Sequence, residues 1–129
     1  MNLRTLMIIN TVIAGVFGVA FVLIPWQVLV IYGIQPTAAL NYIGELFGAA
    51  LLSLAILSWS AKDMEESAAR QAIVRAFFLG DAIGFVLALF GQLSGVLNNA
   101  GWIIVVIYLF LAVGFGSVHF KKQTLKKSD

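Results

Sequence analysis

The sequence predicts an all-α fold: an integral membrane four-helix bundle in a single domain, residues 1–129. The first observation is composition, because 61% of the 129 residues are hydrophobic and 11% are charged, more apolar surface than a soluble chain of this length can bury. The second is that the charges cluster and leave four apolar stretches, each near the roughly 20 residues that one helical crossing requires. We expect spans at about residues 5–25, 40–60, 75–94 and 101–120.

The first span follows Arg4, and its apolar run is longer than that of a secretory leader, so we expect it to remain as a helix. We expect this helix to end at Pro25, because proline lacks a backbone N–H and breaks helix interiors. Residues 26–34 are then expected to form a short amphipathic helix along the membrane interface.

The second and third spans contain the related motifs GELFG (residues 44–48) and GDAIG (residues 80–84). Small residues four apart allow two membrane helices to approach closely. We therefore expect packing contacts at Gly44, Gly48, Gly80 and Gly84. The acid that follows the first glycine of each motif is expected to lie at or beside a helix contact.

The third span is preceded by Asp63 and, three residues later, Glu66, which together resemble a capping box. This pattern predicts a helix from about residue 64 to residue 92. Glu66 also precedes Arg70 by four residues, a spacing that favours an ion pair on one helix face.

The basic residues all fall on one side of the predicted layout. The connections on the other side, residues 33–37 and 94–101, carry none, so the positive-inside rule predicts a multi-pass protein of the cell (inner) membrane with both termini cytoplasmic. The basic tail is expected to attract anionic lipid of the bilayer, and no nucleic-acid partner is expected, because no aromatic residues alternate with its lysines. The 8 basic residues are Arg4, Lys62, Arg70, Arg75, Lys121, Lys122, Lys126 and Lys127.

Glu45 and Asp81 are the ionisable residues that lie well inside the predicted spans, and acids at such positions are candidates for proton or ligand binding. Helical rise places them about 13 Å apart along the membrane normal, so we expect two sites and no catalytic pair. Hydrogen bonding between helices is the structural alternative for both. The expected polar neighbours are Asn10, Thr11, Ser58 and Ser117 for Asp81, and Asn41, Gln92 and Tyr108 for Glu45.

Metal and enzyme chemistry are not expected. The chain has no cysteine and one histidine, His119, which with two acids at different depths does not form a ligand set. The glycines lie mostly within spans and form no phosphate-binding loop. A cofactor, if any, is left open; an apolar ligand is expected to contact aromatic side chains of the last span, namely Tyr108, Phe110, Phe115 and Phe120.

The motifs LFGAALL, GDAIGF and AGWIIVVIYLFLAVGFG, placed in the second, third and fourth of four short spans, resemble those of small four-helix bacterial membrane proteins of the DoxX-like group. The resemblance covers most of the chain in layout. It implies a partner subunit of an oxidoreductase complex, such as those of quinone-linked sulfur oxidation, and it assigns no role to individual residues.

Three functions remain open at this point. The favoured one is a non-catalytic membrane protein that acts as a homo-oligomer or as an accessory subunit of a larger membrane complex, because small-residue faces recur in the spans. The second is a small proton- or cation-coupled transporter or channel that uses Glu45 and Asp81. The third is a membrane protein that binds a quinone, a carotenoid or a lipid between its helices.

Overall fold

The structure, a computed structural model, describes residues 1–128, and these residues form five helices and no strand. The predicted all-α class is confirmed, and four of the helices are long and apolar enough to cross a membrane. The short helix α2 lies between the first two of these. The helices are α1 (Leu3–Leu23), α2 (Pro25–Ile31), α3 (Ala38–Ala61), α4 (Ala68–Leu93) and α5 (Gly101–Lys127).

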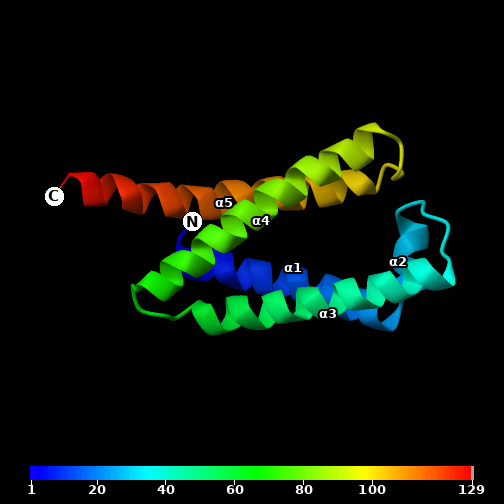
Figure 1. Cartoon of the computed structure of the whole chain (residues 1–129), viewed down its shortest axis with the longest axis horizontal. Helices are drawn as coiled ribbons and strands as arrows, with labels where there is room; N and C mark the ends of the chain where they lie inside the picture. Colours follow the sequence, from blue (N-terminus) through cyan, green and yellow to red (C-terminus); the bar gives the residue numbers. More distant parts are fainter. Residues whose placement is uncertain (129) are drawn as a thin grey trace.

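The four long helices form two antiparallel pairs, α1 with α3 and α4 with α5 (Figure 1). The pairs meet at the end that holds Met1, the α3–α4 connection and the C-terminal turns of α5. This is called the charged end here, because the basic residues cluster there. The opposite end, with residues 25–37 and 94–100, is called the α2 end.

The α1–α3 pair is held at close distance by small residues. A Cβ atom at Gly48 would lie 2.8 Å from the backbone oxygen of Gly18, so the two backbones are in direct contact there. At Gly44 the contact is looser and is made by side chains, with the ring of Phe21 3.3 Å from the position that a Cβ would take. Two helical turns from Gly18 toward the charged end, the hydroxyl of Thr11 donates to the backbone oxygen of Ala55 at 3.3 Å.

The α4–α5 pair uses its glycines differently. The ring of Tyr108 lies directly over Gly84, and the ring of Phe78 lies over Gly116. Gly80, the first glycine of GDAIG, has no described atom within 4 Å of the position that a Cβ would take. Among residues 1–128, therefore, half of this motif packs against a helix and half faces open space.

The core of the molecule lies at the charged end, where both helix pairs contribute side chains. The rings of Phe77 and Phe115 stack there with centroids 5.0 Å apart. Beside it, the buried amide of Asn10 donates to the buried hydroxyl of Ser58 at 2.6 Å and links α1 to α3. The fully packed residues are Leu3, Leu6, Met7, Ala61, Val74, Phe77, Leu111 and Phe115.

At the α2 end, α1 stops at Leu23 and the proline at position 25 begins α2, a position where its missing N–H costs no helical bond. α2 ends at Ile31, before the expected residue 34. Asn98 ties it to the α4–α5 connection: its amide donates to the backbone oxygen of Ile31 at 2.8 Å, and its backbone N–H donates to that of Tyr32 at 3.0 Å. Gly33, with φ +79°, makes the turn beside it.

Replacing Asn98 with alanine is expected to loosen α2 from the α4–α5 connection, because the variant loses the side-chain hydrogen bond to Ile31, which contributes about 1 kcal/mol, and the one that the side chain accepts from the backbone N–H of Ala100. Hydrogen exchange at residues 25–34 is expected to become several-fold faster, while exchange in the core at the charged end stays unchanged. Asn99→Ala is the matched control. Asn99 lies in the same loop, but it contributes through its backbone oxygen, which accepts from the backbone N–H of Trp102 and is kept in the alanine variant. Equal acceleration in both variants would contradict the assigned role of Asn98.

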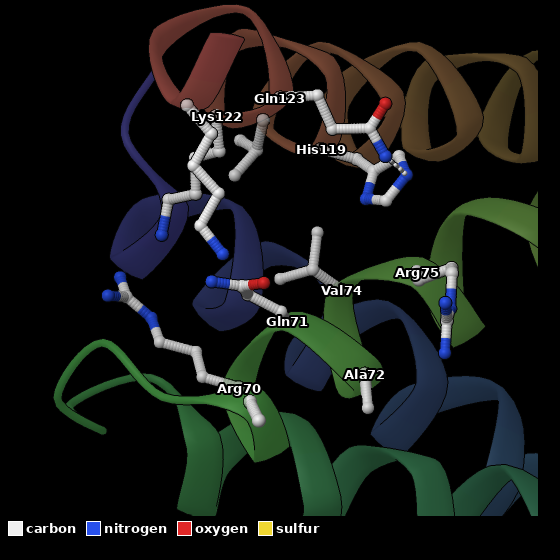
Figure 2. Close-up of a pocket in the computed structure, with 11 residues that line it drawn as sticks. Arg70, Gln71, Ala72, Val74, Arg75, His119, Lys122 and Gln123 are labelled. Carbon is white, nitrogen blue, oxygen red and sulfur yellow. Dashed lines mark hydrogen bonds between the residues drawn. The ribbon is translucent and has the colours of Figure 1, made fainter. Parts of the chain in front are cut away.

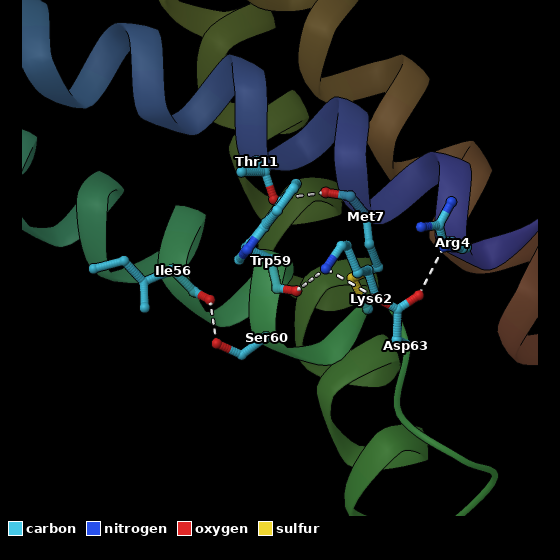
Figure 3. A network of polar contacts seen from close by, with 8 residues as sticks. All are labelled: Arg4, Met7, Thr11, Ile56, Trp59, Ser60, Lys62 and Asp63. Atoms are coloured by element: carbon cyan, nitrogen blue, oxygen red, sulfur yellow. Dashed lines mark hydrogen bonds and ion pairs between the residues drawn. The ribbon is translucent and has the colours of Figure 1, made fainter.

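At the charged end, Asp63 links the start of α1 to the α3–α4 connection (Figure 3). Its carboxylate accepts from Arg4 at 2.7 Å and pairs with Lys62 at 3.0 Å. The hydrogen bond from Arg4, and then that from Lys62, hold the pKa of Asp63 below its usual value. This contact is therefore present at neutral pH and is lost as the pH falls through that lowered pKa.

The capping box predicted at Asp63 is wrong, because Asp63 is engaged by Arg4 and Lys62 instead. The cap of α4 is Ser67, whose hydroxyl accepts from the backbone N–H of Arg70 at 3.2 Å, and the helix begins at Ala68. The predicted ion pair between Glu66 and Arg70 is confirmed, with nitrogen and oxygen 3.0 Å apart.

Candidate functional site

The two helix pairs line an open-sided cavity of about 230 Å³ between them, called the inter-pair cavity here. Phe77 and Leu111 belong both to its lining and to the core, so the cavity begins where the core ends and the pairs diverge toward the α2 end. All four long helices line it. The lining residues are Asn10, Ile13, Ala14, Phe17, Phe21, Phe47, Leu51, Leu54, Phe77, Asp81, Ile104, Ile107, Tyr108 and Leu111.

The lining is apolar apart from three residues, Asn10, Asp81 and Tyr108. One oxygen of the Asp81 carboxyl is buried and has no hydrogen-bond partner among residues 1–128. A buried polar atom without a partner destabilises the fold by about 1–3 kcal/mol, so such an atom points to a bound ligand or water. The amide of Asn10 donates to Ser58 instead.

Aromatic side chains form the part of the cavity nearer the α2 end. Phe21 of α1 and Phe47 of α3 meet edge to face, with ring centroids 5.3 Å apart. Of the aromatic residues expected in the last span, Tyr108 lines the cavity, while Phe115 is in the core and Phe110 and Phe120 are exposed. Sequence reasoning missed the phenylalanines of α1 and α3, because nothing in one sequence shows which face of a span meets another helix.

Glu45 lies elsewhere. It is exposed on α3, and Phe47, two residues further on, lines the cavity. Side chains two residues apart on a helix point in directions about 160° apart, so Glu45 points away from the cavity. The structure therefore does not bring the two acids together, and of the pair considered for transport Asp81 is the one that lines the inter-pair cavity.

The other predicted polar residues are distributed over the molecule. Gln92 donates to the backbone oxygen of Asn98 at 3.1 Å, and Ser117 donates to that of Gly114 at 2.8 Å. Asn41, one turn before Glu45, is half-buried, and its side-chain oxygen has no partner within residues 1–128. Tyr108, expected near Glu45, shares the cavity with Asp81, and so does Asn10, as expected.

The groups available to a ligand in the inter-pair cavity are thus a carboxyl, a phenol and an amide on apolar walls. Within residues 1–128, no group of three or more His, Cys, Asp or Glu side chains is placed to hold a metal ion. A few polar groups in an apolar cavity are typical of sites that orient an organic molecule.

No match to this chain is found among protein-family models, curated proteins or solved structures. The resemblance to the DoxX-like group therefore remains an expectation from the sequence motifs. What the chain does must be inferred from the geometry of its own residues.

Proposed function

We propose that the chain is a non-catalytic multi-pass membrane protein whose inter-pair cavity holds a lipophilic molecule that carries a hydroxyl group, such as a quinol or a lipid alcohol. The observation that carries this proposal is the buried, unpartnered oxygen of Asp81 in an otherwise apolar cavity. A ligand hydroxyl that donates to this oxygen removes the cost of leaving it unpaired.

The size of the cavity indicates which part of such a ligand enters. Its volume of about 230 Å³ is below the roughly 300–1,000 Å³ of sites that enclose a whole drug-sized molecule. A ring or head group is therefore held near Asp81, between Phe77 and Tyr108. The apolar tail extends past the diverging helices into the hydrocarbon of the membrane.

The proposal includes placement in the cell (inner) membrane as a four-helix bundle built from two pairs. Its support is the four apolar helices and the position of the basic residues at the charged end, which by the positive-inside rule is the cytoplasmic side. α2, with its exposed Trp26 and Ile31, then lies along the opposite interface, where indole rings are favoured.

Thermal unfolding in detergent tests the proposed ligand class. A short-chain quinol is expected to raise Tm, because a ligand that binds the folded state stabilises it by about 2.7 kcal/mol at a hundred times Kd. The matched control is the dimethyl ether of the same quinol, which has the same ring and tail but no hydroxyl to donate. Equal rises in Tm with both compounds, or no rise with either, would contradict the proposed hydrogen bond from a ligand hydroxyl to Asp81.

A second candidate function is association with another copy or with a larger membrane complex. It is favoured by α4, in which Val74 and Phe77 are the buried residues and most of the apolar side chains are uncovered within residues 1–128. Gly80 and Gly91 on this helix have no described atom within 4 Å of a Cβ position. Small residues on an uncovered membrane helix are typical of helix interfaces.

Native mass spectrometry tests this second candidate. The wild-type chain is expected to appear as an oligomer or with a partner subunit, and replacement of both Gly80 and Gly91 by leucine is expected to release it as a monomer. Val16→Leu, on the exposed side of α1, is the control and is expected to leave association unchanged. A wild-type chain that is monomeric and brings down no partner from native membranes would contradict this function.

A further inference from the structure

A second concave site, separate from the inter-pair cavity, lies at the charged end between the first turns of α4 and the last turns of α5 (Figure 2). It has a volume of about 260 Å³. Four cationic side chains line it, and we call it the basic cleft. These are Arg70 and Arg75 of α4 and Lys122 and Lys126 of α5.

One carboxylate neutralises part of this charge. Glu66 pairs with Arg70 at 3.0 Å and with Lys122, and it accepts from the amide of Gln71 at 2.9 Å. Glu66 thus pairs with two of the four cations, and Arg75 and Lys126 make no ion pair within residues 1–128. The Nε atom of Arg70 is buried and has no hydrogen-bond partner among residues 1–128. The cleft therefore offers positive charge to an anion.

His119 is the aromatic side chain that lines the cleft, and two phenylalanines pack around its ring outside the lining. His119, which contacts Gln123 at 3.2 Å, stacks on Phe78 with centroids 6.2 Å apart. The ring of Phe120 meets Phe78 edge to face at 5.5 Å. Figure 2 shows His119 and Lys122 projecting from α5 toward α4. A molecule in the cleft thus meets cationic side chains and the imidazole of His119.

We propose that the basic cleft binds the phosphate of an anionic phospholipid in the leaflet at the charged end. The phosphate is held by the cationic side chains that line the cleft, since guanidinium groups donate paired hydrogen bonds to phosphate oxygens. The acyl chains run along the surface beside Phe78 and Phe120. This site is independent of the ligand proposed for the inter-pair cavity, and failure of one proposal leaves the other standing.

The test compares two double variants that remove the same charge. Arg75→Gln with Lys126→Gln changes two cleft cations that take no part in the ion pair with Glu66. Lys121→Gln with Lys127→Gln changes two lysines of the same helix that do not line the cleft. All four residues are exposed, so both double variants are expected to fold, and thermal unfolding in the same detergent verifies this.

Native mass spectrometry then measures retention of phosphatidylglycerol against phosphatidylcholine. The wild-type chain and the Lys121/Lys127 variant are expected to prefer phosphatidylglycerol, and the cleft variant is expected to bind it about tenfold more weakly. Equal loss in both variants, or no preference in the wild type, would overturn the proposal. In a second arm, millimolar inorganic phosphate is expected to leave the lipid bound; displacement of phosphatidylglycerol by inorganic phosphate would show a site for a soluble anion instead.

Discussion

Replacing Gly48 with alanine is expected to lower the free energy of unfolding by about 1–3 kcal/mol, the usual cost of overpacking a close contact. The added Cβ would lie 2.8 Å from the backbone oxygen of Gly18 and 2.9 Å from the Cβ of Phe21. Neither backbone nor Cβ can yield as the end of a flexible side chain does, so α1 and α3 must move apart. Leucine at this position is expected to cost more.

Unfolding in detergent, followed by circular dichroism, measures this effect. Gly80→Ala is the matched control, because it makes the same change at the first glycine of the related motif, where no described atom lies within 4 Å. It is expected to leave the free energy of unfolding unchanged or to raise it by up to about 1 kcal/mol, because alanine favours a helix over glycine. If both variants lose stability to the same extent, the close contact of α1 and α3 at Gly48 is not what holds this pair.

Replacing Asp81 with leucine is expected to separate stability from ligand binding. The variant removes a buried oxygen that has no partner among residues 1–128, so the ligand-free protein is expected to gain about 1–3 kcal/mol of stability. The same change removes the acceptor for a ligand hydroxyl. The rise in Tm caused by a short-chain quinol is therefore expected to disappear.

Asp81→Asn controls for the shape of the side chain, since its amide keeps a carbonyl oxygen that accepts a hydrogen bond. This variant is expected to retain part of the response to quinol. Titrations of all three proteins with the quinol and its dimethyl ether separate the outcomes. A leucine variant that is less stable than the wild type without ligand, or that still responds to the quinol, would contradict the role assigned to Asp81.

The spans could be predicted because a helix that crosses a bilayer needs about 20 mostly apolar residues in a row, and such a run is visible in composition alone. The break at Pro25 was predictable for a similarly local reason, the missing N–H of proline. The start of α4 was not. Asp63 has the residue type and spacing of a cap, but Arg4, which is distant in the sequence, engages its carboxylate, and Ser67 caps the helix.

The candidate site shows more clearly what could not be predicted from the sequence. GELFG and GDAIG are alike in sequence, yet Glu45 is exposed while Asp81 lines the inter-pair cavity. In the first motif both glycines face α1, whereas in the second Gly84 faces Tyr108 and Gly80 faces open space. Which side of a span is covered depends on how helices pair, and α1 pairs with α3 through contacts that local patterns do not specify.

For the same reason the sequence placed Asn10 near Asp81, as the structure has it, but assigned Tyr108 to Glu45. Depth along the membrane placed Tyr108 near Glu45, because depth is the one coordinate that a topology supplies. The rotation of each helix about its axis decides which side chains share a cavity, and that rotation follows from packing in three dimensions.

The most direct test of the inter-pair cavity as a ligand site is native mass spectrometry of the gently extracted protein and two tryptophan variants. Ile104 lines the cavity, and the adjacent Ile103 is exposed outside it, so Ile104→Trp fills the cavity and Ile103→Trp adds the same bulk elsewhere. We predict that the wild type and Ile103→Trp retain a lipophilic molecule and that Ile104→Trp loses it. Retention of the same molecule by Ile104→Trp, or its absence from the wild type, would contradict the proposed function.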